Sequence, residues 1–177
     1  MEFNLLKTIV SNWYGGESNV SMLKVLFRDK VEKGNLSSVT STIDLLNNLF
    51  TSDHLSSWNL GLLCDTISIT KHFALQWEIK KKLPSFPEVK KGTISTEFTP
   101  HRQKLMKFGL ALTTDNVKEI DGLYNTLPKM YTSSWIMITD LEDRLIISEG
   151  NLKIFIDRLR TILNLQQALN TLAEVYL

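Results

Sequence analysis

The residues that could take part in catalysis or hold a metal ion are few and scattered. The chain of 177 residues has one cysteine, Cys64, and three histidines, His54, His72 and His101. A cysteine nucleophile needs a neighbouring base, and a zinc site needs histidine or cysteine ligands at short, regular spacing. Cys64 lies in GLLCDT, inside an apolar helical pattern, and the histidines show no such spacing. The sequence therefore predicts no catalytic residue, no metal site and no cofactor.

Charge and composition limit the partners. The net charge is +1, with 43% hydrophobic and 22% charged residues, which is typical of a soluble globular protein. A nucleic-acid binder usually carries a basic face. A single cysteine cannot form an internal disulfide, and the N-terminus has no apolar run long enough for a signal peptide or a membrane span. We expect a cytoplasmic protein that binds neither nucleic acid nor membrane.

Apolar residues recur at helical spacing almost throughout, so the predicted fold class is all-α. Within this pattern the phrase LSSWNL (55–60) returns 92 residues later as ISEGNL (147–152). At the same offset apolar residues coincide: Ile43 with Trp135, Leu49 with Leu141, and Leu63 with Phe155, for example. In the second helix of each half the offset is 97. We interpret the chain as a tandem repeat of a helical unit of roughly 80 residues.

The two repeats are separated by a stretch of different composition. Residues 80–93, KKKLPSFPEVKKGT, contain two prolines, a glycine and five lysines without a clear apolar period. This composition is typical of a connector. We predict a first domain at 1–80, a solvated linker at 81–97 and a second domain at 98–177, with a lipid- or nucleic-acid-binding patch as the alternative for the basic stretch.

The repeated phrase itself has a structural interpretation. Serine is a good helix N-cap because its hydroxyl accepts a hydrogen bond from a free backbone N–H of the first turn. Ser56 or Ser57, and Ser148, are therefore predicted to begin the fifth helix of each unit. Of the four tryptophans, Trp58 is expected to be exposed, whereas Trp77 and Trp135 align with apolar residues of the other repeat and are expected in the core.

The order of these motifs resembles the death effector domain family. SMLKVLFRDKVEKGNLSSVTSTIDLLNNLF followed by LSSWNLGLLCDTI, and later DLEDRLIISEGNLKIFIDRL, are similar to its second, fourth and fifth helices. The resemblance implies two tandem six-helix death-fold bundles without enzyme activity. Tandem domains of this kind resemble viral and short cellular FLIP proteins and the prodomains of death-receptor initiator caspases, but no caspase-type motif surrounds the cysteine.

The resemblance also implies partners. A FLIP-like chain would bind the adaptor FADD, the initiator procaspase prodomain, or both, and would block caspase activation. The alternative is a prodomain-like scaffold that promotes caspase assembly or signalling through the NF-κB kinase regulatory subunit. A helical protein of another fold, such as a pathogen effector with a ligand groove or a small enzyme, is a further possibility.

Two features of the family are altered here. Its charge triad would fall on Asn19, His72 and Ala74 in the first unit, and on Asn116, Asn164 and Gln166 in the second, so neither unit keeps the ionic triad. Its exposed hydrophobic position on helix 2 falls on Val25, and on Gly122 in the second unit. We therefore predict a partner-binding face around Val25, Arg28 and Asp29, with simple packing of Val25 at the core edge as the alternative.

Overall fold

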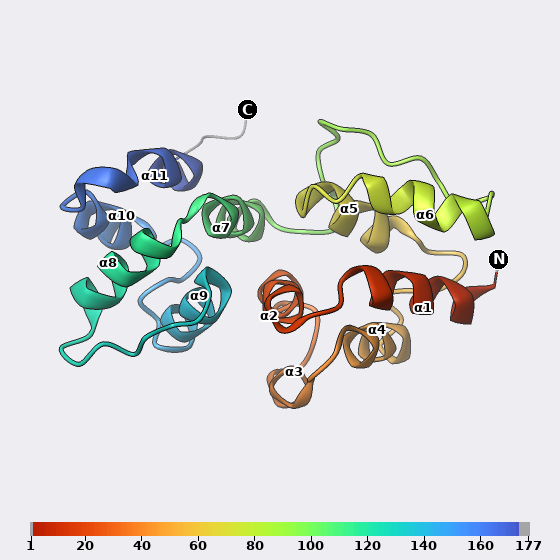
Figure 1. Ribbon diagram of the computed structural model, residues 1–177, viewed down its shortest axis with the longest axis horizontal. Coiled ribbons are helices and arrows are strands. Elements are labelled where there is room, and N and C mark those ends of the chain that lie inside the picture. The colour runs from red at the N-terminus through yellow and green to blue at the C-terminus, as the bar shows by residue number, and fades with distance from the viewer. Residues whose placement is uncertain (1, 174–177) are drawn as a thin grey trace. The chain divides into compact units, whose positions relative to one another are not determined.

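A computed structural model describes residues 2–173 of the chain. All of the regular elements in this range are helices, and the chain divides into two compact units, Met1–Thr99 and Pro100–Leu177 (Figure 1). The predicted all-α class is therefore confirmed for the described residues. No helix within that range is long and apolar enough to cross a membrane.

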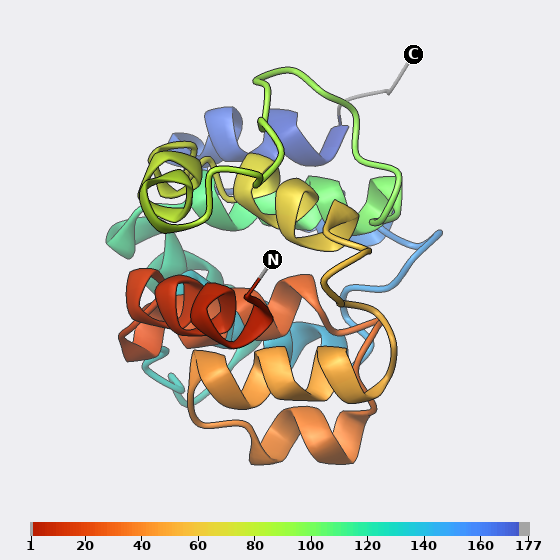
Figure 2. The ribbon, with the colours of Figure 1, turned by 90° about the vertical axis from the view of Figure 1, so that its right-hand side faces the viewer.

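The first unit contains six α-helices. They are α1 (Phe3–Trp13), α2 (Glu17–Leu26), α3 (Lys33–Ser38), α4 (Thr42–Thr51), α5 (Gly61–Ile69) and α6 (Ala74–Lys82). Helix α1 lies between α4 on one side and α6 on the other, as Figures 1 and 2 both show. Fully buried side chains from these helices form the core, among them Leu6, Tyr14, Leu45, Ile67 and Leu75.

The segment predicted to be a solvated linker packs against the first unit. Leu83, Phe86 and Val89 are all buried, at three-residue spacing. The Gln76 side chain of α6 holds the backbone of Val89 on both sides: its Nε2 donates to the carbonyl at 3.1 Å, and its Oε1 accepts from the N–H at 2.8 Å. These residues form a strap over α6, seen in green after that helix in Figure 1. The sequence did not predict that these apolar residues are buried, because a three-residue spacing matches neither a helix nor a strand. They also lie among prolines and lysines, which are typical of a connector.

The described part of the second unit, up to residue 173, is also helical. Its helices are α7 (Pro100–Ala111), α8 (Thr114–Tyr124), α9 (Ser134–Asp143), α10 (Lys153–Leu159) and α11 (Gln166–Ala173), with a short 3₁₀ turn η1 (Leu163–Leu165) before the last. In the described chain no helix joins α8 to α9; residues 125–133 form a loop instead. The described part of this unit thus has five α-helices and one 3₁₀ turn, and the expectation of six helices stays a prediction. The loop contains Pro128, which cannot supply a helical hydrogen bond.

The predicted 92-residue repeat is present in the backbone. Ser41 and Ser133 cap α4 and α9, each accepting an N–H three residues on at 3.3 Å. The next residue in each unit, Thr42 or Ser134, donates its hydroxyl at 2.9 Å to a carbonyl of the first helix of that unit. The capping serines and the hydroxyl donors that follow them are thus each 92 residues apart.

The ends of α4 and α9 continue the same register. Asp53 and Leu145 both adopt positive φ, 62° and 58°, immediately after the helix. The two residues that follow each of them donate their N–H groups to a single helix carbonyl, of Leu49 in the first unit and Leu141 in the second. The apolar register predicted from the sequence therefore reflects a repeated backbone.

The serines of the repeated phrase do not cap a helix. Asn59 donates its N–H to the Ser56 carbonyl at 3.2 Å, and Asn151 donates to Ser148 at 3.1 Å, so both phrases form a turn. Helices α5 and α10 begin later, after Leu60 and Leu152, without a side-chain cap. The predicted N-caps are wrong because the serines stabilise the turn before the helix.

Candidate interaction surfaces

The residues predicted to form a partner-binding face on α2 are not all at the surface. Val25 is 1% exposed in the chain as a whole. Arg28 is partly exposed and Asp29 is exposed, in the turn after α2. Val25 as a partner-binding residue and Val25 as core-edge packing both stay predictions.

The altered triad of the first unit does not form a cluster of its own. Asn19 donates its Nδ2 to the Gly15 carbonyl at 3.0 Å, and Ala74 is exposed. His72 instead bonds to α1: the indole Nε1–H of Trp13 donates to His72 Nδ1 at 3.0 Å. The histidine ring also meets the Tyr14 ring edge-on, with centroids 5.1 Å apart. His72 therefore fastens the α5–α6 turn to the end of α1.

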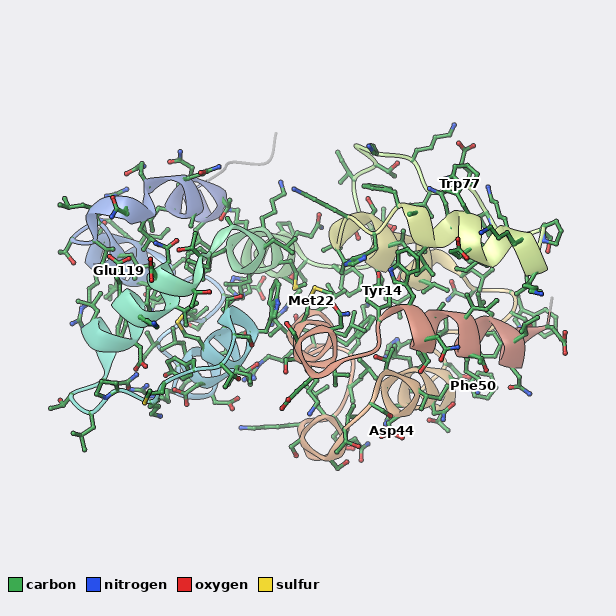
Figure 3. All side chains as sticks on the ribbon, in the orientation of Figure 1. Tyr14, Met22, Asp44, Phe50, Trp77 and Glu119 are labelled. Carbon is green, nitrogen blue, oxygen red and sulfur yellow. The ribbon has the colours of Figure 1, made fainter. Side chains whose placement is uncertain are left out.

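Tyr14 forms the buried side of this contact, between α1 and the helices α5 and α6 (Figure 3). Its hydroxyl is 2.7 Å from the Thr70 hydroxyl, and its carbonyl accepts from Thr42. Burial raises the pKa of Tyr14 far above its usual value, outweighing the hydrogen bond with Thr70 that lowers it. Tyr14 is therefore a neutral core residue at physiological pH.

The Trp13–His72 bond predicts a dependence of stability on pH. Burial lowers the pKa of His72 below its ordinary 6.5. Protonation at Nδ1 would also place two N–H donors against each other. Because the unfolded chain takes up the proton first, the free energy of unfolding should be highest above pH 6.5 and should fall as the pH drops through 6.5 towards the folded-state pKa.

The control for this prediction is His72→Asn, whose side-chain oxygen can still accept from Trp13 but does not titrate. Urea unfolding of both proteins would be followed between neutral and mildly acidic pH. As the pH falls, we expect the free energy of unfolding to decrease more for the unaltered protein than for His72→Asn. Parallel pH profiles for the two proteins would contradict the prediction.

In the second unit the structure brings two of the altered triad positions together. Asn116 and Thr113 form a reciprocal capping box at the start of α8, with both hydrogen bonds at 3.1 Å. The Asn116 Nδ2 also lies 3.4 Å from the Asn164 carbonyl. A carboxylate side chain at this position would have no N–H to donate, so this neutral contact depends on the amide of Asn116. Gln166 lies apart and bonds to Asn170 within α11.

The loop 125–133 between α8 and α9 is held by a buried carboxylate. Asp121, 4% exposed, accepts from the N–H groups of Lys129 and Met130 at 3.0 and 2.8 Å and from the Asn125 side chain at 2.8 Å. Burial alone would raise the pKa of Asp121, but these hydrogen bonds outweigh it, and the pKa is lowered. The loop is thus fixed, with Leu127 and Met130 more than 80% exposed.

An exposed aromatic surface lies on the first unit. It consists of Phe3 on α1, Phe50 at the end of α4 and Trp58 in the turn before α5. The rings of Phe3 and Phe50 are 5.2 Å apart, and the ammonium of Lys7 lies 5.6 and 5.4 Å from their centroids. Phe50 is 45% exposed and stands at α4 beside α1 in Figure 3, while Trp58 is 92% exposed.

A hollow of about 640 Å³ opens at this aromatic surface. Glu2, Asn4, Asp53, Ser56 and Ser57 complete its lining. Trp58 occupies the third position of the Ser56–Asn59 turn, where the Ser56 hydroxyl also accepts the Asn59 N–H at 3.1 Å. A large apolar ring on a fixed turn, beside a hollow with acidic residues at its edge, is suited to contact with another protein.

Sequence reasoning found only part of this surface. The exposure of Trp58 was predicted, because its counterpart in the repeat is Gly150. Phe50 follows the apolar pattern of its helix, so its exposure was not predicted. Its counterpart is Glu142, a charged residue, and this mismatch was the available signal.

The chemistry of the remaining polar residues is limited. Burial, and secondarily the neighbouring Asp65, raises the pKa of the Cys64 thiol to about 11, so the thiol is protonated at neutral pH. Across residues 2–173 no group of three or more histidine, cysteine or acidic side chains is placed to hold a metal ion. Comparison with models of protein families gave no match, and comparison with curated proteins gave none either.

Proposed function

We propose that the chain is a non-enzymatic adaptor of the death effector domain type, which inhibits death-receptor apoptosis by binding FADD, the initiator procaspase, or both. The repeated backbone register between residues 41–59 and 133–151 carries this proposal. It supports two related helical units in series, the arrangement that the sequence resemblance to FLIP-like proteins implies.

The proposed mechanism is occupancy. A chain that docks on the assembly but contributes no protease domain would take a place that a procaspase needs for dimerisation. An interface of roughly 800 Å² per partner is of standard size for a specific complex. We assign the docking contact to the aromatic surface of Phe3, Phe50 and Trp58, because Trp58 is 92% exposed.

The test is a reconstituted reaction in which the purified chain is titrated into FADD and full-length initiator procaspase while caspase activity is followed. We expect activity to fall with dose. Trp58→Asp should weaken the inhibition about 30-fold, because a central tryptophan commonly contributes 2 kcal/mol or more to an interface. Its thermal stability should be unchanged, since Trp58 is 92% exposed.

The matched control is Leu163→Asp, which places the same charge at a residue of equal exposure, 92%, in the second unit. Its inhibition should match that of the unaltered chain. A rise in caspase activity would instead support the scaffold that promotes caspase assembly or NF-κB kinase signalling. No effect together with no co-elution would reject the proposed function and leave the fold unaffected.

A further inference from the structure

The positive charge of the chain is concentrated in one segment. Residues 71–91 hold six lysines against two glutamates and no arginine, a charge of +4, whereas the whole chain carries +1. The rest of the molecule is therefore net negative. Such a concentration is unusual for an ordinary solvated surface, where charges of both signs are mixed.

The fold places these lysines near the two ends of α6. Lys80, Lys81 and Lys82 lie in the last turns of the helix. The strap then returns along α6, because Gln76 clamps Val89, and this places Lys90 and Lys91 beside the start of the helix. The Lys91 ammonium lies 5.5 Å from the Phe73 ring, consistent with that placement.

An exposed tryptophan stands on the same helix. Trp77 is 53% exposed, against its predicted place in the core, and lies on the side of α6 away from α1 in Figure 3. The Lys80 ammonium is 4.8 Å from its ring. An amphipathic ring beside several lysines is the combination that proteins use at the boundary between water and lipid headgroups.

The type of cation separates two classes of partner. Reading of nucleic acid relies on the planar, bidentate arginine side chain and on free aromatic faces that stack on bases. The basic face has only lysines, and one ammonium already lies over its most exposed ring. Lysine, a compact point charge on a flexible stem, suits a diffuse anionic surface such as a leaflet rich in acidic lipids.

We propose that the basic face formed by α6 and the strap, with Lys80–Lys82, Lys90, Lys91 and Trp77, docks the protein on anionic membrane surfaces. The attachment is peripheral and reversible, and it does not depend on the function proposed above. The lysine stems and the ammonium groups act at the headgroups, and Trp77 enters the interface between headgroups and acyl chains.

The experiment is co-sedimentation of the full chain with phosphatidylcholine vesicles, with and without phosphatidylserine. We expect binding only to the anionic vesicles, and its loss when ionic strength rises from about 0.1 M to about 1 M, where the Debye length falls from about 10 to about 3 Å. The triple variant Lys80→Gln, Lys81→Gln, Lys82→Gln should lower the partition coefficient about 100-fold, because each lysine near such a surface strengthens binding about fivefold. Trp77→Ala should lower it about tenfold.

The matched control removes three charges from exposed positions of the second unit, with Lys118→Gln, Lys153→Gln and Arg160→Gln. It has the same net charge as the triple lysine variant and should lose much less binding. Equal loss in the two variants would mean that net charge alone decides, and would overturn the proposal. The proposal would also be overturned if the protein bound neither kind of vesicle. The same holds if it bound an RNA duplex but no vesicles.

Discussion

Replacing Gly109 by alanine is expected to destabilise the second unit by about 3 kcal/mol, at the upper end for overpacking in a core. A Cβ atom at this position of α7 would lie 2.2, 2.6 and 2.8 Å from three carbons of the Trp135 ring. Trp135 is 6% exposed, and its ring cannot move away without displacing the residues packed around it. The glycine is therefore what lets α7 and α9 approach each other.

The chain supplies its own control for this prediction. Gly122 also lies inside a helix, α8, but a Cβ there meets nothing within 4 Å. Gly122→Ala should stabilise the protein by up to about 1 kcal/mol through helix propensity alone. Urea unfolding of the two variants measures the difference, and Trp135→Leu added to Gly109→Ala should recover part of the loss. Equal stability of the two alanine variants would show that the close approach of α7 and α9 is not needed.

The sequence predicted what depends on local pattern and internal repetition. The offset of 92 residues aligned α4 with α9 as equivalent helices of the two repeats. Trp135 was expected in the core, and it is buried. The repetition also placed the two S-x-x-N-L phrases at equivalent positions. It could not show that these serines form turns, because capping and turn formation use the same hydroxyl chemistry.

What the sequence could not predict depends on contacts between distant residues. The strap was taken for a linker because Gln76, which holds it, lies 13 residues before its partner Val89. Nothing in the sequence indicated how the loop after α8 is fixed, because Asp121, which holds it, belongs to the preceding helix and bonds to residues eight and nine positions on.

The second large effect is expected at the ion pair between Arg102 on α7 and Glu142 on α9. Its two hydrogen bonds measure 2.7 and 2.9 Å, and the side chains are only 3% and 7% exposed. Arg102→Met would leave the Glu142 carboxylate buried without its bidentate partner. Breaking a buried pair in this way commonly costs about 3–5 kcal/mol, more than the pair contributes when whole, because the carboxylate loses two charge-assisted hydrogen bonds in a medium of low polarity.

The double variant shows whether the buried charge causes the loss of stability. Arg102→Met combined with Glu142→Leu removes both charges, so it should recover most of the stability lost by Arg102→Met alone, as measured by urea unfolding of all three proteins. Arg160→Gln is the matched surface control: its pair with Asp157 is 63% and 48% exposed, and its loss should change stability by less than about 1 kcal/mol. If the double variant is no more stable than Arg102→Met, the cost lies in lost packing between α7 and α9 and not in the buried charge.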